Sequence, residues 1–184
     1  MEYKLRKYPL FSACGLNCGL CPRYYTDGPS RCPGCGGEGF TSAHCGCGML
    51  SCCQRKGIEY CLECNEFPCK KYDSWGEGDS FITHRNFLSD TEKAKRIGID
   101  AYRAELDEKV GILKELLENY NDGRRKSFFC LAVNLLELDD IKVVMGRIAN
   151  EIEPESTQKE KAAAAAKLFN EIAKKRGILL KLRK

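Results

Sequence analysis

Cysteine is the residue type most able to do chemistry in this chain, because twelve of its thirteen cysteines lie between residues 14 and 69. They fall into short groups with the spacings Cys14-x3-Cys18-x2-Cys21, Cys32-x2-Cys35, Cys45-x-Cys47, Cys52-Cys53 and Cys61-x2-Cys64-x4-Cys69. Such close spacing brings thiolates from one loop to a common centre, which is how tetrahedral sulfur sites are built. The pattern predicts that metal, rather than an apolar core, holds the first third of the protein together.

Eleven of these cysteines are predicted metal ligands: Cys14, Cys18, Cys21, Cys32, Cys35, Cys45, Cys47, Cys52, Cys61, Cys64 and Cys69. The twelve cysteines are enough for three four-sulfur sites, or for two with thiols left over. Cys53 is the thiol expected to be left over, because adjacent cysteines rarely both reach one small ion. Spacing alone leaves open which cysteines share an ion. His44 is expected to be an exposed loop residue, since thiolates are plentiful here, with replacement of one sulfur ligand as the alternative.

The identity of the metal depends on two short motifs. Cys32-Pro33-Gly34-Cys35-Gly36 is typical of zinc ribbons and rubredoxin-like iron sites, where two sulfurs face one metal and glycine permits a left-handed backbone. Cys14-x3-Cys18-x2-Cys21 has the spacing that radical S-adenosylmethionine enzymes use for three corners of a [4Fe–4S] cluster. Those enzymes need alternating strands and helices, a pattern that is missing here, so this class is disfavoured. The sequence predicts two or three zinc ions, with a [4Fe–4S] cluster as the alternative.

The amino-terminal residues and the hydropathy predict the compartment. Residues 1–15 include early positive charges but no apolar run long enough for a signal peptide, and no stretch approaches the length of a membrane span. We therefore expect a cytoplasmic protein that makes no membrane contact. Thiols stay reduced in the cytoplasm, which favours metal binding over disulfides.

The formal net charge of +4 is a weak guide to nucleic-acid binding. Residues 1–75 contain nine Lys or Arg and seven Asp or Glu. If twelve cysteines bound three divalent ions as thiolates, this segment would carry a net charge of about −4. A protein partner is therefore expected, and a nucleic-acid partner has only weak support.

Composition changes near residues 75–78, which predicts a cysteine-rich metal-binding module over residues 10–75 and a helical bundle with a basic C-terminal tail over residues 76–184. In the second part, apolar residues recur every three or four positions and predict four helices. Their expected ranges are 100–120, 128–136, 139–152 and 156 or 157 to 175. The predicted fold class is mainly α: an irregular, metal-stapled cysteine-rich module followed by a bundle of about four helices.

The same motifs resemble a known family, the cysteine-rich proteins of bacteria and archaea grouped as domain of unknown function 3795. The resemblance lies in residues 13–22, 32–35, 47–52, 56–61 and 64–69, and further on in residues 79–86 and 121–130. It implies a metal-binding cytoplasmic protein, with zinc as the metal usually assumed, and it does not indicate which activity, if any, the protein has. The family usually has a small residue where this chain has Cys53, which agrees with a free thiol at that position.

A few residues outside the cysteine groups are also candidates for function. Arg124, Arg125 and Lys126 lie at the start of the apolar second helix, where they could meet a phosphate or an acidic partner. A solvated loop with local ion pairs is the alternative. His84 is expected in a linker docked by its neighbouring phenylalanines, with a place in a cleft as the alternative. Cys130, in an apolar helix, is expected to be a core thiol.

No serine–histidine–carboxylate set or phosphate-binding glycine loop occurs, so no catalytic residue is predicted. The first functional hypothesis is a zinc-binding interaction module. The second is an iron–sulfur redox or maturation protein.

Overall fold

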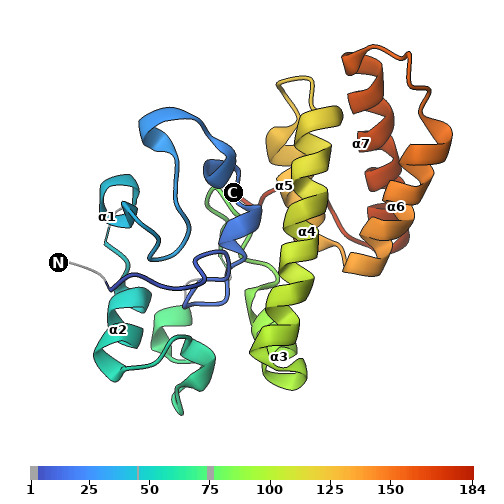
Figure 1. Ribbon diagram of the computed structural model, residues 1–184. Helices are drawn as coiled ribbons and strands as arrows, with labels where there is room; N and C mark the ends of the chain where they lie inside the picture. The colour runs from blue at the N-terminus through green and yellow to red at the C-terminus, as the bar shows by residue number, and fades with distance from the viewer. Residues whose placement is uncertain (1–3, 45, 74–76) are drawn as a thin grey trace. The chain divides into compact units, whose positions relative to one another are not determined.

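The computed structural model describes residues 4–44, 46–73 and 77–184 (Figure 1). These residues form two compact units, which divide within the long helix α4 (Ile99–Asn119), between Leu106 and Asp107. Arg183 and Lys184 belong to the first unit. The predicted boundary between residues 75 and 76 falls outside the described residues, so the predicted module and bundle ranges stay a prediction.

The first unit consists of short helices joined by loops, and its described residues include no β-strand. Its 3-10 helices are η1 (Cys18–Leu20), η2 (Pro22–Tyr25), η3 (Gly28–Ser30), η4 (Cys61–Glu63) and η5 (Lys70–Tyr72). Its α-helices are α1 (Phe40–Ala43), α2 (Gly48–Lys56), α3 (Phe87–Ile97) and the first part of α4. The frequent glycines and prolines keep these elements short, because both residue types interrupt regular helix. The prediction of a mainly helical protein is confirmed.

Helix α2 shows how the cysteines are built into the local structure. Cys47 is its N-cap, and the Cys47 thiol accepts a hydrogen bond from the N–H of Leu50 (3.5 Å). Gly57 ends the helix with a left-handed φ of +68°, and its N–H donates to the carbonyl of Cys53. One helix therefore begins at a predicted ligand and carries two further cysteines in its body.

The first unit has an apolar core as well as its cysteines. Phe11 is fully buried, and its ring lies 5.3 Å from that of Tyr60 and 4.7 Å from that of Tyr102. Cys35 and Cys53 are themselves part of a buried cluster of apolar side chains. The expectation that metal takes the place of an apolar core is therefore wrong in one respect, because these thiols are packed among apolar groups.

A buried polar contact fixes the first cysteine loop against α3. Asn17, which is 2% exposed, donates to the carboxylate of Asp90 (2.8 Å) and accepts from the hydroxyl of Tyr102 (3.0 Å). Helix α3 was not predicted from the sequence. Its buried face includes Thr91 and Ala94, which give little apolar signal.

The second unit contains the rest of α4 followed by three helices, α5 (Lys126–Leu135), α6 (Leu138–Glu151) and α7 (Gln158–Lys175). All four predicted helices are found, with ends that differ from the prediction by at most two residues. Helix α7 packs against α5 and α6, with Phe169 and Ala165 fully buried. Thr157 caps α7, and its side chain and that of Glu160 form a reciprocal capping box.

A buried carboxylate connects the chain terminus to the segment that precedes α3. The side chain of Asp79 is 0% exposed and pairs with Arg183 (2.9 Å), and it also accepts from the backbone N–H of His84 (2.8 Å). Burial alone would raise the pKa of Asp79, but the hydrogen bonds from Arg183 and His84 lower it to about 2.

Replacing this carboxylate should destabilise the protein at neutral pH. We expect Asp79→Asn to lower the free energy of unfolding by about 1 to 3 kcal/mol, because a buried charge-assisted network loses its anion. A lowered pKa stabilises the fold above the unfolded pKa of about 4 and loses that effect as pH falls toward 2, so the difference between parent and variant should shrink over that range.

Urea unfolding followed by circular dichroism at several pH values would measure this difference. Asp100→Asn is the matched control, because the Asp100 side chain is 92% exposed and its loss should cost less than about 0.5 kcal/mol. Equal effects of the two substitutions at pH 7 would contradict the expectation.

Candidate metal centres

The eleven described cysteines between residues 14 and 69 divide between two cavities of the first unit. The larger sulfur cavity, of about 400 Å³, is lined by six of them: Cys14, Cys18, Cys21, Cys32, Cys35 and Cys47. The smaller sulfur cavity, of about 50 Å³, is lined by the other five: Cys52, Cys53, Cys61, Cys64 and Cys69. None of these cysteines lines both cavities, and Cys45 lies outside the described residues. The structure thus supplies a grouping that the spacing had left open.

Backbone hydrogen bonds position the loops around the larger sulfur cavity. The N–H of Cys32 donates to the carbonyl of Arg23 (2.9 Å), which places the second cysteine pair beside Cys21 of the first group. Two backbone N–H groups, those of Arg23 and Tyr24, act on the Cys21 sulfur and oppose the effect of burial on its pKa. Backbone N–H donors of this kind stabilise a sulfur that carries negative charge.

The motif over residues 32–36 forms the predicted tight knuckle. Gly34 and Gly36 have left-handed φ values of +87° and +68°. The N–H of Cys35 donates to the carbonyl of Pro9 (2.9 Å), so the knuckle lies directly against the chain at Pro9. A Cβ on Gly34 would come within 2.6 Å of that carbonyl oxygen, which leaves room only for glycine.

The thiols of the larger sulfur cavity are electrostatically unfavourable as free anions. Burial raises the pKa of Cys14 and Cys18, and the nearby thiol of Cys35 raises both further. The Cys14 sulfur also lies 3.0 Å from the Ser12 hydroxyl. Such a group of buried, mutually repelling thiols becomes favourable as thiolates only when a cation joins it.

The smaller sulfur cavity contains a close pair of sulfurs, Cys53 and Cys61, whose Sγ atoms are 3.4 Å apart. Hydrogen bonding to Cys61 raises the pKa of Cys53, and the same bond lowers the pKa of Cys61 to about 7. Tyr72 adds a side-chain hydrogen bond to Cys61. Cys53 was expected to be left over, but it lies among the other thiols of this group.

An exposed cation lies at the rim of the smaller sulfur cavity. The ammonium of Lys56 lies 3.1 Å from the Cys64 sulfur and 3.0 Å from the carboxylate of Glu66. Both Lys56 and Glu66 line the cavity, and their side chains are 39% and 72% exposed. The lysine therefore offers positive charge to one thiol from the solvent side.

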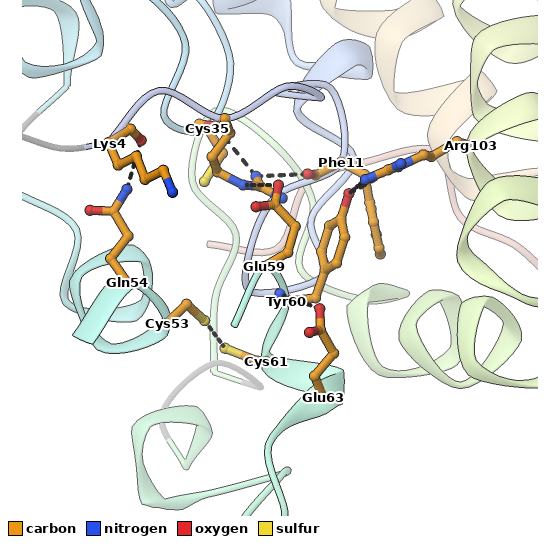
Figure 2. A network of polar contacts seen from close by, with 11 residues as sticks. Lys4, Phe11, Cys35, Cys53, Gln54, Glu59, Tyr60, Cys61, Glu63 and Arg103 are labelled. Atoms are coloured by element: carbon orange, nitrogen blue, oxygen red, sulfur yellow. Dashed lines mark hydrogen bonds and ion pairs between the residues drawn. The ribbon is translucent and has the colours of Figure 1, made fainter. Parts of the chain in front are cut away.

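A buried cation contacts the backbone of Cys35, one of the cysteines that line the larger sulfur cavity. The side chain of Arg6 is 3% exposed, and its Nε donates to the carboxylate of Glu59 (2.8 Å). Its Nη1 donates to the carbonyls of Phe11 (2.9 Å) and Cys35 (3.3 Å). Figure 2 shows Glu59 pointing toward Cys35, with Tyr60 reaching Arg103 and the Cys53–Cys61 contact nearby. Arg6 was not among the predicted site residues, because it belongs to no motif and lies outside the cysteine groups.

Two histidines also line the larger sulfur cavity. His44 is half-buried and stacks on Phe40 at 4.8 Å, so the expectation of an exposed loop histidine is wrong. His84, expected in a linker, lines the same cavity.

As placed, no three Cys, His, Asp or Glu side chains within residues 4–44, 46–73 and 77–184 form a group that could hold a metal ion. The structure therefore brings the predicted ligands into two groups without arranging them for coordination.

The predicted anion site has a local partner for one of its cations. Arg125 forms an ion pair with Asp122, and its backbone N–H donates to the side chain of Asn121 (3.2 Å). Arg124 is exposed and Lys126 begins α5. Anion binding by these residues stays a prediction.

Cys130 is 1% exposed, as expected for a core thiol.

Comparison with known proteins identifies the cysteine-rich segment. Residues 10–74, about a third of the chain, match the model of a family described as Protein of unknown function (DUF3795). The predicted resemblance is confirmed over this segment, whereas residues 79–86 and 121–130 lie beyond the match. Searches of curated proteins and of solved structures found no match. Among the described residues, no helix is both long and apolar enough to span a membrane.

The close approach of the knuckle to Pro9 can be tested with a pair of glycine substitutions. We expect Gly34→Ala to lower the free energy of unfolding by about 2 kcal/mol or more, because a left-handed alanine would also clash with the Pro9 carbonyl. Gly28→Ala is the control, since Gly28 has a φ of +76° but no atom within 4 Å of an added Cβ. It should lose only about 1 kcal/mol. Equal losses in denaturant unfolding would contradict the steric argument.

Proposed function

We propose that this protein binds metal at two separate sulfur centres, with zinc at each. The observation that carries the proposal is the division of eleven cysteines into two cavities with no member in common. Two independent four-sulfur sites need this kind of division, because each closed zinc site takes its own set of thiolates.

The donor set around each cavity fits a metal held by sulfur. In the larger sulfur cavity, four of the six cysteines would bind the metal, and backbone N–H groups already act on the sulfur of Cys21. In the smaller sulfur cavity, Cys52, Cys61, Cys64 and Cys69 are the ligands we assign, with Cys53 beside them. When bound, zinc with four sulfur ligands contributes folding free energy and leaves no position open for a substrate.

We infer a structural and interaction role in the cytoplasm. None of the described cysteines forms a disulfide, which suits a reducing compartment. Thiolate ligands would make the cysteine-rich segment acidic, which favours a protein partner over a nucleic acid.

A second function is favoured by one specific observation, the size of the larger sulfur cavity. With about 400 Å³ and six cysteines it offers more space and more sulfur than one zinc ion requires, whereas the smaller cavity has about 50 Å³. A [4Fe–4S] cluster uses four cysteine ligands and occupies more volume than a single ion. The alternative is therefore an iron–sulfur redox or maturation protein that carries its cluster in the larger sulfur cavity.

Metal content of single-cysteine variants would test the two-centre proposal. We expect about two zinc ions per parent chain, and the loss of about one ion from Cys35→Ser and one from Cys64→Ser, because each variant breaks a different four-sulfur site. Cys130→Ser is the control and should keep both ions, since Cys130 lines neither cavity. Elemental analysis after gel filtration gives the readout. A metal-free parent chain would defeat the proposal, and loss of all metal from both variants would contradict independent centres.

Purification without oxygen would decide between the two metals. Zinc at both centres predicts a colourless protein with no labile sulfide. A brown protein with about four iron atoms and labile sulfide, lost in Cys35→Ser and retained in Cys64→Ser, would overturn zinc at the larger sulfur cavity and favour the cluster.

A further inference from the structure

Arg6 is a buried cation of the first unit, and one of its donor groups is unpaired. Its side chain is 3% exposed, yet its ion-pair partner Glu59 is 41% exposed. Its Nη1 donates hydrogen bonds to two backbone carbonyls. Its Nη2 is buried and has no hydrogen-bond partner among the described residues. A buried guanidinium normally satisfies all of its donors, because an unpaired buried N–H group is unfavourable. The unpaired Nη2 therefore calls for a hydrogen-bond acceptor that the described side chains, as neutral groups, do not provide.

The backbone fixes Arg6 on the knuckle that carries Cys35. The N–H of Arg6 donates to the carbonyl of Gly36 (3.0 Å). A Cβ on Gly36 would lie 3.0 Å from Cγ and Cδ of Arg6, so the glycine gives the arginine stem its space. The ring of Tyr60 covers the guanidinium at 4.9 Å. These contacts hold the charge in one place, directly behind a cysteine of the larger sulfur cavity.

Arg6 lies against one cysteine of the larger sulfur cavity. Its Nη1 donates to the carbonyl of Cys35 (3.3 Å), which keeps Nη2 of the same guanidinium close to this residue. A neutral thiol is a weak acceptor, whereas a thiolate is a strong one. The acceptor that suits Nη2 is thus a thiolate sulfur.

We propose that the larger sulfur cavity binds a net anionic metal–thiolate centre, and that Arg6 is its buried counter-cation, with Nη2 donating to the Cys35 thiolate. This inference depends on the proposed metal-binding function. Four thiolates around one divalent ion carry a net charge of about −2, and a [4Fe–4S] centre with four thiolates is also anionic. A cation fixed in advance favours binding of such a centre and hinders loss of its thiolate by protonation. Arg6 is a positioning residue here, because it acts on the metal through Cys35.

The neighbouring Arg103 provides a matched control. It also stacks on Tyr60, at 5.5 Å, and donates to the Tyr60 hydroxyl (2.7 Å). Its charge is not among the main effects on the described cysteines whose pKa is shifted. Arg103→Gln therefore removes a cation from the same aromatic ring without removing one from the sulfur groups.

The experiment compares the purified parent protein with Arg6→Gln, Arg6→Lys and Arg103→Gln. Each protein is loaded with Zn²⁺ to measure affinity and with Co²⁺ to observe the visible thiolate-to-metal band. We expect Arg6→Gln to weaken Zn²⁺ binding about 10- to 100-fold in competition with a chromogenic chelator and to shift the Co²⁺ band. Alkylation followed by mass spectrometry should show faster modification of Cys32 and Cys35, with Cys64 and Cys69 unchanged. Arg6→Lys keeps the charge but loses the guanidinium geometry, so it should bind Zn²⁺ more tightly than Arg6→Gln and more weakly than the parent, whereas Arg103→Gln should stay within about threefold of the parent.

Unchanged Zn²⁺ affinity and an unchanged Co²⁺ band in Arg6→Gln would overturn the inference. So would an Arg6→Lys variant as weak as Arg6→Gln, because the effect would then come from packing and not from charge. If Arg6→Gln does not fold, Glu59→Gln is the test: it removes the competing carboxylate, so Zn²⁺ should bind as tightly as in the parent or more tightly, and weaker binding would overturn the inference. A parent protein that binds no metal would instead defeat the proposed function itself.

Discussion

The first unit depends on one physical constraint, the confinement of many sulfur atoms within a short stretch of chain. Eleven described thiols between residues 14 and 69 share two cavities, and burial raises the pKa of several of them. Thiolates placed so close together repel one another, so their common ionisation requires positive charge. Backbone N–H groups, Lys56 and Arg6 supply part of it. A bound metal is the remaining source that the proposed function invokes.

The two sulfur cavities meet this constraint in different ways. The smaller one has little volume, and Lys56, whose side chain is 39% exposed, lies at its rim. The larger one has about 400 Å³, and the buried Arg6 contacts the backbone of Cys35, which lines it. A solvent-exposed cation is screened by water and salt, whereas a buried one acts at nearly full strength. The two centres should therefore differ in how firmly they hold anionic sulfur.

Long periodic segments and short cysteine motifs were predictable from the sequence to different extents. The helices α4 to α7 follow from apolar residues at helical spacing, and Thr157 with Glu160 marks the start of α7. The α3 helix escaped prediction because Thr91 and Ala94 occupy buried positions where larger apolar residues would give a signal. The knuckle over residues 32–36 was predictable in its local backbone, but its contact with Pro9 was not.

The sequence by itself determined that sulfur dominates the first third of the chain, that its loops turn tightly, and that the remainder is helical. These properties depend on residue type and on spacing within about ten residues, which local geometry controls. Only the tertiary structure decided which cysteines lie together, that Cys53 lies beside Cys61, and that Arg6 comes to rest behind Cys35. The physical reason is that residues 29 and 53 positions away from Arg6 come into contact with it only when the chain folds back on itself, and no local pattern encodes such contacts.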